Sequence, residues 1–514
     1  MHGQWFFSRL IRQAPSDGPG IFPGGLFGLL PGMLLACLIV DRAAMAQPPG
    51  PGSPSSALES AAVLEGALVE AISSAEKSVV AIARVRHSEA GDQKQELDPS
   101  DPDFIPNEYA SGVVVGADGL ILTNYHVLGD PEKNDYFVWV QRRPYKVLQV
   151  QKVDKVVAGD PWTDLAVLRI AAENLQPVRY GDVTKLRKGM IVLVLGNPYA
   201  IARDGEASAG WGILANTGRK ATPRTRSLEA GSQRETLYHS GGLLQLDARL
   251  NLGTSGGAVL NLKGEMIGLV TAQTPLDGAD QSAGFAIPAD QVFRRTVEHL
   301  KAGRKIQVGF LGVSVRPLDI KQHHQGSKGV RIDQVLAGSG ADRAGMRIGD
   351  VITQVDDHPV QVRNDLFHYL GGLEPETRVR FDIRRGQSAS SAGEEKKLEA
   401  VLSKRYSELA GPAYSELSDP SWRGIRVDYA TAMPPRLSGQ PSDPLGCVAV
   451  VHVQLDSPAW KSGLRAGAYV SHVGKTRVEN PLQFHRLVQG RDAEVTLIRC
   501  RDDRQGELLL VPLP

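Results

Sequence analysis

The stretch Asn251–Gly257 (Asn-Leu-Gly-Thr-Ser-Gly-Gly) most constrains what this chain can fold into. It sets Ser255 among glycines, after the apolar run 243–246 and before another at 258–260. Glycines permit positive φ and let a second backbone come close, so a serine here has a free hydroxyl beside backbone N–H groups. That arrangement suits a nucleophile next to an oxyanion hole. By itself the stretch also fits an ordinary turn or the nucleophile elbow of an α/β-hydrolase.

Two upstream residues stand in an informative order. His126 lies at the end of the apolar run Gly119–Val127, and Asp164 directly precedes the strand-like pattern Leu165–Leu168. Chymotrypsin-like enzymes run histidine, aspartate, serine, whereas α/β-hydrolases run serine, aspartate, histidine. The chain also lacks the alternation of strands and helices that a parallel α/β sheet needs. The order therefore excludes an α/β-hydrolase, while Asp160 remains a competitor for the aspartate.

Six motifs in the correct order resemble the HtrA/Deg (high-temperature-requirement) family of serine proteases. They are Thr123–Val127, Asp164–Val167, Leu195–Pro198, Gln245–Ala248, Gly253–Gly257 and Gly284–Pro288. The resemblance implies a mainly β chain in which a chymotrypsin-like double β-barrel carries the active site in the cleft between its barrels. It implies neither a metal nor a cofactor.

The same resemblance assigns roles to the site residues. Ser255 would attack the scissile carbonyl, His126 would accept and return the proton, and Asp164 would orient the imidazole. The N–H groups of Gly253 and Ser255 would form the oxyanion hole. Asp164 is preferred to Asp160 because it directly precedes Leu-Ala-Val, as it does in the family.

Two positions depart from the family pattern. Thr254 stands where the family usually has asparagine, and Ala258 stands where it often has proline. Neither change removes a catalytic atom, but a β-branched residue can alter how readily the oxyanion loop adopts its active form. Two functions therefore stay open, an ATP-independent endopeptidase for unfolded proteins and a proteolytically silent scaffold or holdase chaperone.

The primary specificity pocket is expected along the strand after Gly268 and around residues 284–287. Four apolar residues are predicted to line it, which favours cleavage after small or medium aliphatic residues: Leu269, Val270, Phe285 and Ile287. The segment 219–243 is rich in Arg, Gly and Ser. By resemblance it occupies the place of the loop that senses a peptide-bound C-terminal module, and otherwise it is a solvated insertion.

The last third of the chain contains an internal repeat. Residues 339–349 match residues 457–467 in the pattern Ser-x-Ala-x-x-x-Gly-Φ-x-x-Gly, so two copies of one module follow the protease region. The pattern resembles PDZ domains, which capture C-terminal peptides through a loop of backbone N–H groups and an adjacent strand. In the first copy that loop would be Phe310, Leu311, Gly312 and Val313.

The second copy is less regular. Its corresponding loop would include Gly424 and Ile425, and Ala468 replaces the aspartate found at Asp350. Peptide binding there, or a packing role, both remain open. Cys447 and Cys500 fall in expected strands of this copy, where two buried thiols are favoured over a disulfide.

The N-terminal residues 1–46 are typical of an export signal. Arg9 and Arg12 precede an apolar stretch, and Ala44-Met45-Ala46 matches a cleavage site. Lipidation at Cys37 and an uncleaved leader that associates with the membrane are alternatives. Export to a periplasm or cell surface is expected. The net charge of +1 gives no global field for nucleic acid.

These features define the expected domains. They are a signal peptide (1–46), a flexible tether with a short helix that starts near Ala61 (47–75), a trypsin-like protease domain (76–303), a PDZ domain (307–386), a linker (387–420) and a second PDZ domain (421–514). Expected partners are unfolded proteins or peptides and C-terminal peptides. Homo-oligomerisation stays open, because the aromatic residues on which relatives' trimer contacts depend are absent between Gln47 and Val80.

Overall fold

The structure is a computed structural model that describes residues 54–86, 106–141, 143–147, 156–197, 206–220, 236–251, 253–275, 282–324, 326–386, 393–406, 413–415, 420–433, 445–490, 495–499 and 507–511. The predicted leader, most of the arginine-rich segment and Cys500 lie outside these residues. Within them, no helix is both long and apolar enough to cross a membrane.

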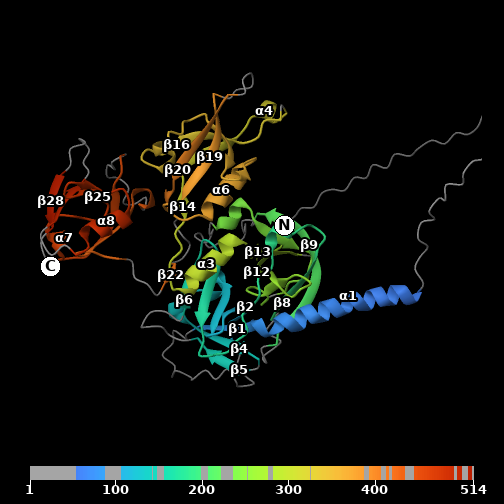
Figure 1. Cartoon of the computed structure of the whole chain (residues 1–514). Helices are drawn as coiled ribbons and strands as arrows, with labels where there is room; N and C mark the ends of the chain where they lie inside the picture. Colours follow the sequence, from blue (N-terminus) through green and yellow to red (C-terminus); the bar gives the residue numbers. More distant parts are fainter. Residues whose placement is uncertain are drawn as a thin grey trace, which may run out of the picture. The chain divides into compact units, whose positions relative to one another are not determined.

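The first half of the region 76–303, joined by the later strand β22, forms an antiparallel sheet (Figure 1) with the strand order β22-β6-β7-β3-β2-β1-β4-β5. The strands are β1 (Val79–Arg86), β2 (Glu108–Gly116), β3 (Leu120–Asn124), β4 (Asn134–Val140), β5 (Arg143–Lys146), β6 (Val156–Asp160), β7 (Leu165–Arg169) and β22 (Tyr414–Ser415). Short helical turns are η1 (Glu76–Ser78), α2 (Tyr125–Leu128) and η2 (Pro131–Lys133). Neighbouring residues such as Val113 and Val114 belong to different core clusters, because successive strand residues point to opposite faces.

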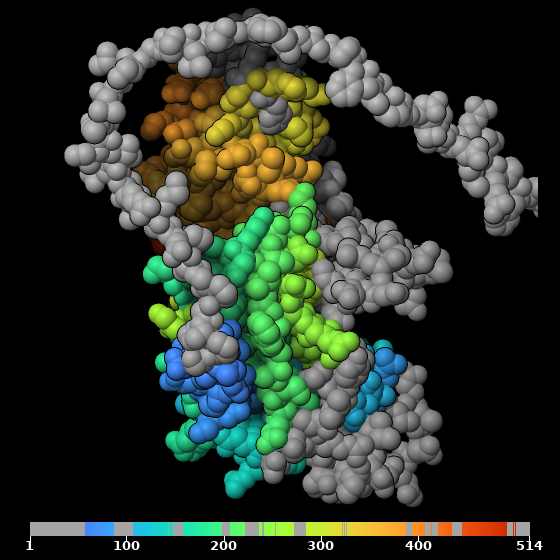
Figure 2. All heavy atoms as spheres, turned by 90° about the vertical axis from the view of Figure 1, so that its right-hand side faces the viewer, coloured from blue at the N-terminus to red at the C-terminus, as the bar shows by residue number. Residues whose placement is uncertain are grey.

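The second half closes into a six-stranded barrel with the order β10-β13-β12-β11-β8-β9. Its strands are β8 (Ile191–Gly196), β9 (Ser208–Arg219), β10 (Leu243–Leu246), β11 (Ala258–Leu260), β12 (Met266–Pro275) and β13 (Ser282–Pro288), with turns η3 (Val183–Lys185) and η5 (Leu237–Ser240). β9 runs as a green strip over the face seen in Figure 2. Trp211, on this strand, is 60% exposed.

Helix α3 (Gln291–Lys301) follows the barrel where the apolar stripe of the sequence predicts a helix. Asp290 caps it by accepting a hydrogen bond from the Phe293 N–H at 2.9 Å, which satisfies one free donor of the first turn. Phe293 and Leu300 are buried in the cluster that the two halves of the region share.

The C-terminal repeat is confirmed as two sheets of the same topology. The first has the order β15-β16-β17-β19-β20 with β18 beside β17, and the second has β23-β24-β25-β27-β28 with β26 beside β25. Ser339 and Ser457 cap equivalent short helices in the two copies.

The elements of the first copy are β14 (Gly309–Phe310), β15 (Val313–Pro317), α4 (Ile320–His324), β16 (Val330–Val335), α5 (Gly340–Arg343), β17 (Val351–Val355), β18 (His358–Pro359), α6 (Arg363–Gly371), β19 (Arg378–Arg385), β20 (Glu394–Val401) and β21 (Ser403–Lys404). Those of the second copy are β23 (Ile425–Tyr429), η6 (Ala430–Ala432), β24 (Val448–Val453), α7 (Pro458–Lys461), β25 (Tyr469–Val473), β26 (Thr476–Arg477), α8 (Pro481–Val488), β27 (Val495–Arg499) and β28 (Glu507–Val511).

Two expected boundaries are wrong. The first repeat does not end at residue 386, because β20 pairs with β19 over eight positions inside the supposed linker 387–420. The residues of β20 are charged and mostly face solvent, so the sequence does not show the apolar alternation from which a strand is predicted. The N-terminal helix α1 (Pro54–Ala75) begins seven residues before Ala61, within the supposed tether, because proline is well tolerated in the first turn of a helix.

Candidate active site

His126 and Asp164 meet at one end of the first sheet. His126 Nδ1 lies 2.8 Å and 3.0 Å from the two carboxylate oxygens of Asp164, and the His126 N–H donates to Oδ1 at 3.1 Å. Asp160 does not contact the histidine; its carboxylate accepts from the N–H and hydroxyl of Thr163 at 2.9 Å and 2.6 Å. The geometry therefore separates the two candidate aspartates.

Backbone hydrogen bonds also fix the position of Asp164. Asp164 has φ = +56°, a conformation that non-glycine residues rarely adopt. Its carbonyl accepts from the Tyr125 N–H at 3.0 Å and from the Asn124 amide at 3.3 Å. These bonds lock the aspartate against the segment that carries the histidine.

A threonine from the six-stranded barrel completes this network. The Thr271 hydroxyl, on β12, donates to Asp164 Oδ2 at 2.6 Å. Burial alone would raise the pKa of Asp164, but the charge and hydrogen bonds of His126 and the Thr271 hydroxyl outweigh it and hold that pKa below its usual value. The carboxylate is therefore ionised and both of its oxygens accept hydrogen bonds.

Asp160 lies in a different electrostatic environment. It is 2% exposed, and burial raises its pKa to about 6 despite hydrogen bonds from Thr163 and the Trp162 N–H. Two aspartates four residues apart thus have pKa values shifted in opposite directions.

The Ser255 loop is bound to the strands that lead to His126. The Ser255 carbonyl accepts from the Ser111 N–H at 2.8 Å, and the Thr123 hydroxyl donates to the Ser111 carbonyl at 2.8 Å. Gly256 has φ = +83°, and a Cβ there would lie 2.0 Å from the Ser111 carbonyl oxygen. No other residue type fits at Gly256 without displacing the loop.

Ser111 itself is a buried bridge that the motifs do not reveal. Its hydroxyl donates to the Gly253 carbonyl at 2.8 Å and accepts from the Asn197 N–H at 2.8 Å. Within the described residues, the amides of Gly253 and Ser255 donate to no backbone carbonyl.

Thr254 holds the loop through its hydroxyl. That group donates to the Asn251 carbonyl at 2.6 Å and accepts from the Asn251 N–H at 3.1 Å, while its methyl group faces Gly196. Threonine therefore closes the turn locally at the position where the family pattern has asparagine.

The four residues predicted for the specificity pocket are all buried, at 0–6% exposure. Leu269 and Ile287 are paired across β12 and β13 and belong, with Phe285, to the core shared by the two halves of the region. Val270 belongs instead to the interior cluster of the barrel. The four side chains are thus divided between two faces of the sheet.

The two predicted peptide-binding loops have the same backbone arrangement. Gly312 has φ = +88° and its carbonyl accepts from the Leu336 N–H at 2.9 Å. Gly424 has φ = +86° and its carbonyl accepts from the Gln454 N–H at 2.7 Å. Leu311, Val313 and Ile425 are buried, while Phe310 is half-buried. No cluster of metal-ligating side chains occurs among the residues that the structure describes.

Comparison with known proteins gives two family matches. Residues 110–269 match the trypsin-like peptidase domain, and residues 309–395 match the PDZ domain. A probable periplasmic serine endoprotease DegP-like of Ectopseudomonas mendocina is 29% identical over 74% of this chain and 74% of its own. The periplasmic pH-dependent serine endoprotease DegQ of Escherichia coli is 26% identical over 85% of this chain and 90% of its own. A solved structure of the HtrA-type protease AlgW with tripeptide covers 66% of this chain and 97% of its own at 25% identity, with a TM-score of 0.48.

The fold and these matches define a trypsin-like serine protease that carries a PDZ domain. The chain is similar to the HtrA/Deg proteases in both regions and is an exported serine endopeptidase. The resemblance drawn from its motifs is thereby confirmed.

Proposed function

We propose that His126, Asp164 and Ser255 are the catalytic triad of this endopeptidase. Ser255 Oγ attacks the scissile carbonyl while His126 Nε2 takes its proton, and Asp164 stabilises the resulting imidazolium through Nδ1. The proton then passes to the leaving amine, and water releases the acyl group by the reverse sequence. The observation that carries this assignment is the His126–Asp164–Thr271 hydrogen-bond network.

The oxyanion that forms in each step would be held by the N–H groups of Gly253 and Ser255. Removing one such donor typically costs about 10²–10³ in rate. The buried Ser111 hydroxyl bonds to the Gly253 carbonyl and so restrains the peptide group that lies between the two donor peptide groups.

The substrates are proposed to be unfolded or misfolded proteins, with small or medium aliphatic residues at the cleavage site. C-terminal peptides would bind at the first PDZ domain along β15, which is an edge strand of its sheet, by strand addition. The second repeat shares this topology, so we propose that it is also a PDZ domain. Self-association through the N-terminal helix is part of the same proposal; membrane association through residues 1–46 stays a prediction outside the described residues.

The test is cleavage of casein by the purified chain and by Ser255→Ala, with and without a peptide that ends in a hydrophobic carboxylate. Ser208→Ala, an exposed serine on β9, is the matched control. Cleavage and fluorophosphonate labelling that disappear only in Ser255→Ala would support the triad. Absence of both in the unaltered chain, with peptide present, would favour the silent scaffold or holdase.

A further inference from the structure

The turn between β6 and β7 connects two buried carboxylates. Asp160 is the last residue of β6 and pairs with Leu165, the first residue of β7, so Asp164 is the final residue of the turn. Asp160 organises this turn by accepting hydrogen bonds from Thr163 and from the Trp162 N–H. The conformation of residues 160–164, which we call the aspartate turn, therefore decides where the Asp164 carboxylate lies.

The centre of the aspartate turn contacts the first PDZ module. Trp162 is 3% exposed, and its Nε1–H donates to the Gly371 carbonyl at the end of α6 at 3.3 Å. The guanidinium of Arg405, just after β21, stacks on the indole at 4.6 Å. Trp162 is thus contacted by Gly371 and by Arg405, which both follow the protease region in sequence.

The chain beyond the first PDZ module also reaches the strand that leads into the aspartate turn. β22 pairs antiparallel with β6, Tyr414 opposite Gly159 and Ser415 opposite Ala158. This pairing covers the outer edge of β6 immediately before Asp160. Contacts from α6, Arg405 and β22 therefore converge on residues 158–162.

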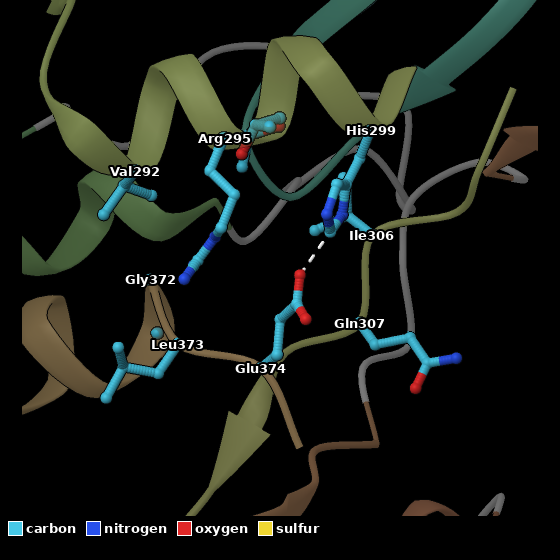
Figure 3. Close-up of a pocket in the computed structure, with 11 residues that line it drawn as sticks. Val292, Arg295, His299, Ile306, Gln307, Gly372, Leu373 and Glu374 are labelled. Atoms are coloured by element: carbon cyan, nitrogen blue, oxygen red, sulfur yellow. Dashed lines mark ion pairs between the residues drawn. The ribbon is translucent and has the colours of Figure 1, made fainter. Parts of the chain in front are cut away.

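The contact between Trp162 and α6 is closely packed, so neither side can move independently. The Leu237 N–H, from η5, donates to the Trp162 carbonyl at 2.9 Å. A Cβ added at Gly371 would lie 2.7 Å from Leu237 Cδ1 and 3.4 Å from the Trp162 ring. In the adjoining hollow, Glu374 faces His299 at 3.2 Å (Figure 3). A displacement of α6 must therefore move Leu237, Trp162 or both.

We propose that the aspartate turn couples the first PDZ module to the catalytic aspartate, with Trp162 and Asp160 as positioning residues for Asp164. The inference rests on the proposed triad. Packed interiors shift as units rather than deform smoothly. A displacement at Gly371 should therefore move Trp162 and Asp160, and with them the Asp164 carboxylate. A misplacement of about 1 Å at a catalytic group can cost ~10² in rate.

Gly371→Ala is the direct test, because it inserts one methyl group at the junction without touching the catalytic groups. We expect kcat for a chromogenic peptide to fall about tenfold with little change in KM, since a positioning defect acts on the reacting geometry. The low-field proton of the His126 Nδ1–H···Asp164 bond should broaden or shift. Gly210→Ala, on β9, where an added Cβ would meet only the Arg249 carbonyl oxygen at 3.8 Å, is the control and should change neither.

Two further variants separate coupling from misfolding. Arg405→Ala removes the stacking partner of Trp162 from outside the protease region, and Arg378→Ala, at an exposed ion pair between β19 and β20, is its matched control. Trp162→Phe keeps the aromatic ring but loses the bond to Gly371. The double variant Trp162→Phe with Gly371→Ala should lose no more kcat than the more severe of the two single variants, because both changes act on the same contact.

Fluorophosphonate labelling of Ser255 distinguishes failure of this inference from failure of the triad. If the unaltered chain is not labelled even with peptide present, the triad assignment and the coupling are both wrong. If the unaltered chain and a folded Gly371→Ala protein are labelled at equal rates, with equal kcat and an unchanged low-field proton, the aspartate turn does not couple the modules.

Discussion

Thr271 shows how one hydroxyl contributes to the site at the scale of a residue. Its bond to Asp164 Oδ2 at 2.6 Å is a hydrogen bond to a charged group, which is worth about 1.5–3 kcal/mol. Thr271→Val keeps the shape and removes the donor, so kcat/KM should fall by roughly 10- to 100-fold. Thr353→Val, which removes a hydroxyl bonded to a backbone carbonyl in the first PDZ module, should leave peptide hydrolysis unchanged. Equal rates for the two variants would contradict the role of Thr271.

The raised pKa of Asp160 predicts that the stability of the protein depends on pH. Because burial raises its pKa to about 6 from 3.8, the folded protein keeps a proton that the unfolded chain releases over this interval. The stability from this group is therefore fully present below pH 3.8 and is lost as pH rises through about 6, a loss of roughly 2–3 kcal/mol. Asp160→Asn removes this titration. Urea unfolding at pH 4.5 and 7.5 should show a smaller pH effect in the variant, whereas parallel profiles would contradict the prediction.

At the scale of an element, the loop before β15 depends on the small size of Gly312. A Cβ there would lie 2.2 Å from the Ser339 Cβ, so Gly312→Ala must displace the loop whose N–H groups we propose to bind a peptide carboxylate. We expect peptide affinity at this module to fall at least about tenfold, with cleavage in the absence of peptide retained. Gly326→Ala, which shares a positive φ but has open space, is the control. Retained peptide stimulation in Gly312→Ala would place the ligand elsewhere.

Elements with strong local signals were predictable from the sequence. The apolar stripe and cap of α3, the repeated Ser339 and Ser457 turns, and the residue order around Asp164 each depend on neighbours close in the chain. β20 was missed because its charged residues face solvent along an edge, so little apolar alternation marks it. Its pairing with β19 depends on contacts that local propensity does not describe.

The candidate site was predictable only as far as its motifs extend. The contact of Thr271 with Asp164 spans 107 positions, and no spacing rule connects them. The predicted pocket included both Leu269 and Val270, yet consecutive strand residues point to opposite faces. Their division between two core clusters follows from that alternation, which the pocket prediction did not apply.

At the scale of the whole molecule, helix α1 has apolar side chains that stay exposed among the residues that the structure describes. Its 22 residues span about 33 Å, and Ala71 and Ala75 are buried against the protease core. By contrast, Val63 is 75% exposed and Val69 is 57% exposed. Helical stability in proteins comes mostly from the packing of an apolar face, so we expect this part of α1 to pack against a partner. We expect that partner to be another copy of the chain.

Val63→Ser with Val69→Ser tests this expectation by removing apolar surface without adding charge. The unaltered chain should elute with a mass several times that of one chain in size-exclusion chromatography with light scattering, and the double variant should approach the mass of one chain. Each exposed valine that becomes buried contributes about 1.5–3 kcal/mol, so two per chain, repeated in every copy, are enough to shift assembly at micromolar concentration. Glu65→Gln, at an exposed position of the same helix, is the control. Equal masses for the unaltered chain and the double variant would mean that α1 does not hold copies together. The absence of aromatic residues between Gln47 and Val80 would then be explained, because this chain would not use the N-terminal contact of its relatives.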